Sequence, residues 1–232
     1  EINLKLIQLL TSDYSKIDLK FAKRKNIIVI DNLGANSTSV AEHTLAILLS
    51  ILRNINLQNF YLKKGVWKNM KHFNIELKNK KLGIIGMGRI GSKVASRARA
   101  FGMDVFFNDI KKKIIKKNVK LYKFKNKNYI YKKCDFLSLH VDLNKRTKHL
   151  INKSVLKKMK KDAILINTSR GSVINEKELT LFLIKNKKFR VGLDVFDRET
   201  KINKKLVKLK NVLATPHSGP SMETRTNLLN NI

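Results

Sequence analysis

The sequence predicts an α/β fold built on a doubly wound parallel sheet, and two observations support this prediction. From residue 81 onward, short apolar runs alternate with helix-length segments, which is the pattern of parallel strands joined by right-handed crossover helices. The first of these runs, Lys81–Ile85, also leads directly into a glycine-rich turn at residues 86–91. The alternation indicates the fold class, and the turn indicates which kind of doubly wound sheet to expect.

The turn reads Gly-Met-Gly-Arg-Ile-Gly, and a helix-length segment without a breaker follows it at residues 92–101. Gly86 permits a tight turn, Gly88 leaves room for a pyrophosphate beside the backbone, and Gly91 lets the helix pack closely on the sheet. The exposed N–H groups and the dipole at the helix start then hold the phosphates. A second strand-like run at residues 103–108 ends in an acid, Asp109. This order predicts a Rossmann-type dinucleotide site rather than an ordinary glycine turn.

Asp109 indicates which dinucleotide is bound. Its carboxylate is expected to accept hydrogen bonds from the adenosine ribose hydroxyls and to repel a 2′-phosphate, which favours NAD over NADP. Lys111, Lys112 and Lys113 follow it in the sequence and would instead favour NADP, because their ammonium groups could bind the 2′-phosphate. NAD is the cofactor that the sequence favours.

The segments before the turn are a mixture of strands and helices. Residues 4–10 and 27–30 are predicted as buried strands around a short helix at residues 18–25. Ser39 is predicted to cap a helix. That helix carries an apolar stripe, interpreted as facing the core or a subunit, at Ala41, Leu45, Leu48, Leu49 and Leu52. Residues 65–80 are predicted to form a connecting arm.

The segments after Asp109 continue the alternation. Further strands are predicted at residues 136–141, 163–167, 191–195 and 212–214, and helices at residues 154–159 and 176–185. Residues 111–133 are rich in lysine and only weakly periodic, so they are predicted to form a solvated strand-and-helix excursion. The single cysteine, Cys134, excludes an internal disulfide framework and is interpreted as a small residue near the core.

The charge of the chain is strongly positive, with 50 Lys and Arg residues against 17 Asp and Glu residues and a formal net charge of +33. A basic surface attracts nucleic acid in a salt-sensitive way, so a nucleic-acid-binding protein is one hypothesis. The lysines are spread over nearly every segment, however, and no DNA or RNA motif accompanies them. No specific nucleic-acid partner is therefore expected.

The length and the apolar content limit the remaining possibilities. A chain of 232 residues with 43% hydrophobic residues supports one large domain, or one domain and part of another. The apolar run at residues 40–52 is too short to span a bilayer, and no signal peptide is visible, so no membrane partner and a cytoplasmic location are expected. The chain starts at Glu1, which leaves open a targeting segment before it. No metal site is predicted.

Four motifs beyond the glycine turn carry a resemblance to a known family. They are Asn-Ser-Thr-Ser-Val-Ala-Glu-His at residues 36–43, Asn-Thr-Ser-Arg-Gly at 167–171, Gly-Leu-Asp-Val-Phe at 192–196 with Glu199 after it, and Thr-Pro-His at 215–217. In order and spacing the chain resembles the D-isomer-specific 2-hydroxyacid dehydrogenases. Around the glycine turn and the Gly-Val-Trp sequence before it, the chain is most similar to the D-3-phosphoglycerate dehydrogenase branch.

The resemblance implies a reaction and a set of residues for it. Hydride would move between C2 of the substrate and the nicotinamide, Arg170 would bind the carboxylate and the carbonyl oxygen, and His217 would exchange the proton. Glu199 would pair with His217 and fix its tautomer. The implied cofactor-binding residues are Gly86, Gly88, Arg89, Ile90, Gly91, Asp109, Thr168 and Asp194, the last of which would hold the nicotinamide amide. The implied substrate-binding residues are Ser12, Asn36 and Arg170.

The resemblance also implies a division of the chain. Residues 1–36 would be part of a flavodoxin-like substrate lobe, residues 37–217 the NAD-binding domain, and residues 218–232 the start of a helix that returns to that lobe. A homodimer through the nucleotide domain is expected. Asp13 adds a negative charge where the family places a carboxylate-binding loop. The function expected is NAD-dependent oxidation of a D-2-hydroxyacid to its 2-oxoacid and the reverse, with 3-phosphoglycerate as one candidate; the alternative is a catalytically weak NAD-binding regulator or scaffold on the same fold.

Overall fold

Seven parallel strands form the main sheet in the computed structural model, which describes residues 3–9, 17–31, 34–67 and 74–221. The spatial order is β5-β4-β3-β6-β7-β8-β9, so the order reverses between β3 and β6. These strands are β3 (Lys81–Ile85), β4 (Asp104–Asn108), β5 (Lys123–Phe124), β6 (Phe136–Leu139), β7 (Ile164–Asn167), β8 (Arg190–Leu193) and β9 (Val212–Ala214). The doubly wound Rossmann-type sheet is therefore confirmed, and each strand predicted after residue 81 is found to within two residues at either end.

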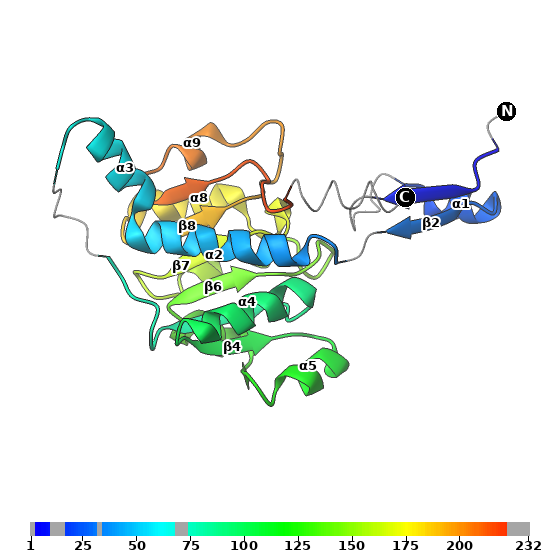
Figure 1. The fold of residues 1–232 in the computed structure, drawn as a ribbon, viewed down its shortest axis with the longest axis horizontal. Helices are drawn as coiled ribbons and strands as arrows, with labels where there is room; N and C mark the ends of the chain where they lie inside the picture. The colour runs from blue at the N-terminus through cyan, green and yellow to red at the C-terminus, as the bar shows by residue number, and fades with distance from the viewer. Residues whose placement is uncertain (1–2, 10–16, 32–33, 68–73, 222–232) are drawn as a thin grey trace.

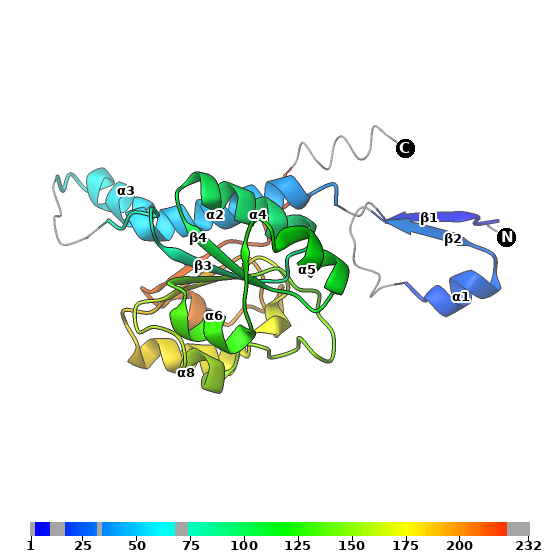
Figure 2. The same ribbon diagram turned by 90° about the horizontal axis from the view of Figure 1, so that it is seen from below.

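Helices cover both faces of this sheet, as Figures 1 and 2 show. One face carries α2 (Ser37–Arg53) and α4 (Arg89–Ala100), and the other carries α6 (Lys127–Lys133) and α8 (Glu176–Lys185). Successive residues of a strand point to opposite faces, so Ile84 packs with α2 and α4, whereas Ile85 packs with α6 and α8. Burial on both faces explains why the central strands are apolar throughout. Shorter helical segments are α5 (Lys112–Asn118), α7 (Lys153–Leu156), α9 (Lys204–Val207) and the 3₁₀ turn η1 (Gly171–Val173).

The start of α2 differs from the predicted one. The helix begins at Ser37 after an N-cap at Asn36, and the hydroxyl of Ser39, which was predicted as the cap, donates to the carbonyl of Gly219 at 2.6 Å. Residues 36–39 are all of types that commonly cap helices, so the sequence alone does not identify the first residue of the helix. The hydroxyl of Ser39 instead bonds to a residue far away in the sequence. The predicted stripe faces the core, where it buries Ala41, Leu45, Leu48 and Leu52 and half-buries Leu49.

Two other segments also differ from the predictions. Helix α3 (Ile55–Lys63) lies before the predicted connecting arm and was missed, because it buries no residue and has no core-facing stripe. Residues 111–133 were predicted to be solvated, but α6 buries Ile130 and Tyr131 under the sheet. The buried face of α6 was not recognised because lysines surround its two buried residues in the sequence.

Two parallel strands near the start of the chain form a separate small sheet. They are β1 (Leu6–Leu9) and β2 (Ile28–Asp31), with α1 (Leu19–Arg24) between them, and Figures 1 and 2 show this unit apart from the large sheet. The strands were predicted to be buried, but the structure leaves Ile28 62% exposed and Leu6 47% exposed. In the described part of the chain only the short helix α1 packs on these two strands, so much of their apolar surface stays exposed. That this unit belongs to a flavodoxin-like lobe stays a prediction.

The described part of the chain has no helix that is both long and apolar enough to cross a membrane. It also has no cluster of three or more His, Cys, Asp or Glu side chains placed to hold a metal ion. Cys134 is buried beside the core, and burial raises the pKa of its thiol to about 12, which agrees with its interpretation as a packing residue.

His140 follows β6 and carries a buried imidazole. The Nε2 atom lies 2.9 Å from the hydroxyl of Ser138, and the buried Nδ1 atom has no hydrogen-bond partner in the described part of the chain. Burial lowers the pKa of His140 from 6.5 to about 3, so the folded protein holds this ring neutral.

Replacing His140 by Asn should flatten the dependence of stability on pH. The unfolded chain binds a proton at His140 below about pH 6.5, whereas the folded chain does not do so until about pH 3. Stability is therefore lost as the pH falls through the unfolded pKa, by about 1.4 kcal/mol between pH 7.5 and 5.5. Urea denaturation at both pH values should show this extra loss in the parent and not in His140→Asn. The exposed His149 provides the control, because His149→Asn should keep the parental difference. An equal difference in all three proteins would show that His140 is not held neutral by the fold.

Candidate functional site

Two neighbouring cavities lie at the carboxyl ends of the large sheet's strands. The glycine-turn cavity has a volume of about 600 Å³ and is lined by residues of the turn and by those that follow β4 and β6. The arginine–histidine cavity has a volume of about 470 Å³ and is lined by the start of α2 and by the loops that follow β7, β8 and β9. Asp142 lines the first cavity and Leu143 the second, so the loop after β6 borders both.

The glycine turn has the geometry that its sequence predicts. Gly86 has a φ of +93°, which favours glycine, and a Cβ there would lie 2.2 Å from the carbonyl oxygen of His140. A Cβ on Gly91 would lie 2.1 Å from the carbonyl oxygen of Gly86, so α4 packs directly on the turn. A Cβ on Gly88 would meet nothing within 4 Å, which leaves open space beside the N-terminus of α4. Backbone N–H groups and a positive helix end bordering an open space fit a pyrophosphate.

Asp109 is held in place by the backbone around it. Its Oδ2 accepts from the N–H of Met87 at 2.8 Å and its Oδ1 from the N–H of Lys111 at 2.8 Å. Each carboxylate oxygen can accept a further hydrogen bond, so the group remains available to a ribose in the glycine-turn cavity. The basic side chains of Lys111, Lys127, Lys145 and Arg146 also line this cavity.

Two of the predicted cofactor-binding residues line neither cavity: Gly91, which packs on the turn itself, and Arg89. Arg89 is the first residue of α4, its side chain is exposed, and a Cβ on Gly34 would meet its Cδ at 2.7 Å. Only its place at the helix start, and not its side chain, supports a role in phosphate binding. Ser12 lies outside the described residues, as does Asp13.

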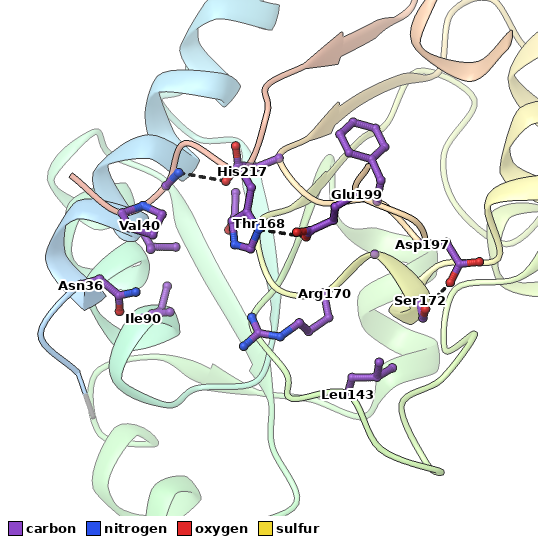
Figure 3. A pocket seen from close by; sticks show the side chains of 15 residues that line it. Asn36, Val40, Ile90, Leu143, Thr168, Arg170, Ser172, Asp197, Glu199 and His217 are labelled. Atoms are coloured by element: carbon purple, nitrogen blue, oxygen red, sulfur yellow. Dashed lines mark hydrogen bonds and ion pairs between the residues drawn. The ribbon is translucent and has the colours of Figure 1, made fainter. Parts of the chain in front are cut away.

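The arginine–histidine cavity brings together seven of the predicted site residues, which come from the N-cap of α2, from α4 and from three different loops (Figure 3). They are Asn36, Ile90, Thr168, Arg170, Asp194, Glu199 and His217. Residues that were not among the predicted site residues complete the lining, among them Val40, Leu143 and Phe196.

Arg170 follows β7 in a turn that is built around a buried side chain. Asn167 is fully buried; its Oδ1 accepts from the N–H and the hydroxyl of Ser169, and its Nδ2 donates to the carbonyl of Arg170 at 2.9 Å. A Cβ on Gly171 would lie 1.9 Å from the carbonyl carbon of Phe196, so this turn docks on the loop that leads to Glu199. The guanidinium extends into the cavity (Figure 3).

His217 and Glu199 form the predicted pair. The distance from Nδ1 of His217 to Oε1 of Glu199 is 2.9 Å, and the two side chains are 43% and 48% exposed. Because Nδ1 donates its proton to the carboxylate, Nε2 is the nitrogen that remains to exchange a proton with a ligand. A pair this exposed contributes little to stability.

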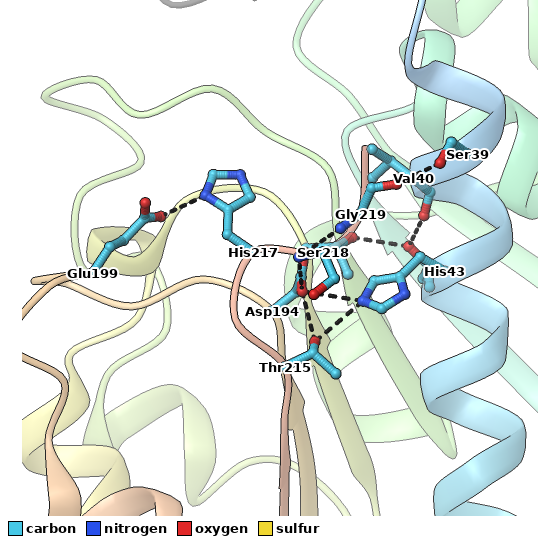
Figure 4. A network of polar contacts seen from close by, with 11 residues as sticks. Ser39, Val40, His43, Asp194, Glu199, Thr215, His217, Ser218 and Gly219 are labelled. Atoms are coloured by element: carbon cyan, nitrogen blue, oxygen red, sulfur yellow. Dashed lines mark hydrogen bonds and ion pairs between the residues drawn. The ribbon is translucent and has the colours of Figure 1, made fainter. Parts of the chain in front are cut away.

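Asp194 is the most buried charge of the site, with 1% of its surface exposed. Its Oδ1 accepts from the hydroxyl of Thr215 at 2.6 Å and from the N–H of Ser218 at 2.8 Å, and its Oδ2 accepts from the N–H of Gly219 at 3.0 Å (Figure 4). Burial alone would raise the pKa of Asp194, but hydrogen bonds from His43, Thr215 and Ser218 outweigh burial and lower it. Asp194 is therefore an ionised carboxylate at neutral pH.

Two supporting residues were not assigned a role from the sequence. His43 contacts Asp194, as described below. Glu176, the first residue of α8, accepts from the N–H of Asp197 at 2.5 Å, and Asp197 in turn accepts from the hydroxyl of Ser172. Burial raises the pKa of Glu176, and the Asp197 N–H offsets this only in part. The position of His43 inside the motif at residues 36–43 was a signal for it, whereas Glu176 is typical of any acidic first helix turn.

Comparison with known proteins agrees with this geometry. Residues 45–219 match the family model described as D-isomer specific 2-hydroxyacid dehydrogenase, NAD binding domain. The chain is 39% identical over 208 residues to the D-3-phosphoglycerate dehydrogenase of Methanocaldococcus jannaschii, which covers 89% of this chain and 40% of that protein. It is 39% identical over 222 residues to the hydroxypyruvate reductase of Thermotoga maritima, which covers 94% of this chain and 72% of that protein.

A solved structure of a 2-hydroxyacid dehydrogenase is also similar to this chain. The D-lactate dehydrogenase of Aquifex aeolicus, complexed with NAD and lactic acid, superposes with a TM-score of 0.86 at 31% identity, which covers 98% of this chain and 74% of that one. The chain thus spans between two fifths and three quarters of the length of these relatives. Its nucleotide site is an NAD site, and the chain belongs to the D-isomer-specific 2-hydroxyacid dehydrogenase family.

Proposed function

We propose that the chain carries the reaction centre of an NAD-dependent D-2-hydroxyacid dehydrogenase, which interconverts a D-2-hydroxyacid and its 2-oxoacid. The supporting observation is that Arg170 and the His217–Glu199 pair line one cavity, directly beside the cavity of the glycine turn. An anion-binding fork and a proton-exchanging group in one space are what this reaction requires.

Each residue then has a chemical task. NAD supplies the hydride chemistry when it is bound. The planar guanidinium of Arg170 binds the substrate carboxylate and its carbonyl oxygen together, which fixes the orientation of C2. In reduction, Nε2 of His217 donates a proton to the carbonyl oxygen, and in oxidation it removes the hydroxyl proton. Glu199 holds Nδ1 at 2.9 Å, which keeps the ring oriented and fixes its tautomer.

The substrate that we favour is a small 2-oxoacid with one carboxylate. Arg170 is the only Lys or Arg among the described residues that line the arginine–histidine cavity. A phosphorylated substrate such as 3-phosphohydroxypyruvate would need a further cation for its phosphate. The similarity of the sequence to the D-3-phosphoglycerate dehydrogenase branch therefore stays a prediction about the substrate. Hydroxypyruvate and glyoxylate are the first substrates to test.

A catalytically weak NAD-binding regulator or scaffold remains the second candidate. The observation in its favour is the exposure of His217 and Glu199, since proton exchange and hydride transfer are more effective in a site that excludes water. Turnover with any 2-oxoacid separates the two candidates, because a regulator would bind NADH without oxidising it.

We also propose that the chain forms a homodimer through the α3 region of the nucleotide domain, which we define as residues 55–67. Helix α3 buries no residue and leaves Ile55, Phe60 and Leu62 about half exposed, while Trp67 beyond it is 74% exposed. Such a concentration of large apolar side chains on one protruding segment is typical of an interface between protein chains.

NADH oxidation should occur with 2-oxoacids and should depend on Arg170. A panel of hydroxypyruvate, glyoxylate, pyruvate and 3-phosphohydroxypyruvate, followed at 340 nm, identifies the substrate. Arg170→Lys loses the bidentate fork, so kcat/KM should fall by about a hundredfold. The exposed Arg198, which lines neither cavity, provides the control, and Arg198→Lys should keep the parental value. NADH binding without turnover on any member would favour the regulator.

Cofactor preference should depend on Asp109. Removing its carboxylate in Asp109→Ala takes away the acceptor for the ribose hydroxyls, so the Kd for NADH should rise by about tenfold. The Kd for NADPH should change less, because the repulsion of a 2′-phosphate is removed at the same time. Fluorescence titration with both cofactors measures this. Asp104→Ala, which breaks an exposed ion pair with Lys123 at the far end of β4, should leave both values unchanged. A preference unchanged in Asp109→Ala would exclude Asp109 from the site.

Self-association should depend on the apolar side chains of the α3 region. Phe60→Glu places a charge in the proposed interface, so sedimentation velocity should show a shift from dimer to monomer at micromolar concentration. Phe101→Glu provides the control and should stay dimeric, because Phe101 is 46% exposed at the end of α4 and lies outside the α3 region. A monomeric parent, or a Phe60→Glu variant that stays dimeric, would contradict the proposed interface.

A further inference from the structure

His43 contacts the site from outside both cavities. It lies on α2, its side chain is 20% exposed, and its Nε2 is 3.1 Å from Oδ1 of Asp194 and 3.1 Å from Oγ1 of Thr215. The hydroxyl of Thr215 donates its own proton to Asp194, so both oxygens that face His43 are acceptors. Nε2 of His43 is therefore a donor to both, which fixes its tautomer (Figure 4).

The contact matters because Asp194 anchors the histidine loop, which we define as residues 215–219. Its carboxylate accepts from Thr215, Ser218 and Gly219, and its backbone carbonyl accepts from the N–H of His217 at 2.8 Å. His217 has a φ of +53°, in the left-handed region that residues other than glycine adopt uncommonly. The orientation of the His217 ring thus depends on Asp194 staying in place.

Helix α2 meets this loop at two points on the same face. Ser39 donates to the carbonyl of Gly219 at 2.6 Å, and His43, one helical turn further along, donates to Asp194. Because α2 is packed firmly against α4 and the sheet, it provides a rigid surface on which the loop rests. Ser39 contacts only the loop backbone, whereas His43 contacts the anchoring carboxylate itself.

We propose that His43 is a positioning residue for the dehydrogenase reaction, which donates from Nε2 to Asp194 and Thr215 and so holds His217 in line with the substrate carbonyl. The inference rests on the proposed function. His43 does not line either cavity, so it acts through Asp194 and not by contact with the substrate. The lowered pKa of Asp194, to which the hydrogen bond from His43 contributes, agrees with this role.

Two substitutions of His43 test the proposal. His43→Phe keeps a planar ring and removes the donor, whereas His43→Gln places an amide nitrogen about where Nε2 lies and keeps the donor. The matched control is Glu42→Gln, at the adjacent position, whose carboxylate pairs with Arg97 at 2.9 Å and not with the loop. The full chain of each variant is compared with the parent in oxoacid reduction, NADH binding, melting temperature and exchange of the Ser218 and Gly219 amides.

In His43→Phe, kcat should fall by about tenfold, the loss of one hydrogen bond to a charged group. The KM for the oxoacid should change by less than about twofold, because Arg170 is not affected. The amides of Ser218 and Gly219 should exchange faster. His43→Gln should restore kcat to within about threefold of the parent and restore slow exchange, and Glu42→Gln should match the parent throughout.

Three results would overturn the proposal. One is a His43→Phe variant with parental kcat and parental amide exchange. Another is a loss of kcat that parallels a lowered melting temperature and a raised KM and is not restored by His43→Gln, which indicates a merely structural residue. The third is unchanged amide exchange in His43→Phe when the parent itself shows no turnover, because the positioning role then fails separately from the proposed function. If the exchange in that case is faster and His43→Gln reverses it, only the proposed function fails.

Discussion

The site depends on one buried carboxylate, that of Asp194. A charge with 1% exposure is costly to bury unless hydrogen-bond donors surround it. Here the donors come from two separate elements: the side chain of His43 on α2, and the histidine loop, which supplies the hydroxyl of Thr215 and two backbone N–H groups. Satisfying the charge therefore requires α2, β8 and the loop to converge, and this convergence creates the wall of the arginine–histidine cavity.

The opposite wall is fixed in a different way. The turn that carries Arg170 docks on the backbone of residues 196–197 because residue 171 has no side chain, and Glu176 holds the N–H of Asp197. These contacts set the start of the loop that ends at Glu199. The His217–Glu199 pair is too exposed to impose its own geometry, so its distance of 2.9 Å follows from two anchored backbones that bring the side chains together.

Local chemistry explains which parts of the structure the sequence predicts. The β3–turn–α4–β4 unit and helix α8 are found as predicted because glycine spacing, capping and apolar periodicity act over a few residues. The His43–Asp194 contact joins residues 151 positions apart, and no local pattern indicates it. The predictions for helix α3 and strand β2 failed for another reason. Apolar residues are expected to be buried, but the described part of the chain leaves the apolar residues of these two elements exposed or only partly buried. For the site, the sequence predicts the side chains that line the two cavities better than the residues that hold those side chains in place.

The histidine loop has a consequence for how this sequence tolerates change. Asp194 holds residues 218 and 219 through their main-chain N–H groups, so these bonds do not depend on which side chain follows His217. A proline at 218 would remove a donor, and a Cβ at 219 would press on Oδ2 of Asp194 at 3.1 Å, but many other residues at 218 preserve the anchor. A protein with such an excess of Lys and Arg can therefore vary in side-chain composition around this loop while the backbone hydrogen bonds keep the loop geometry constant.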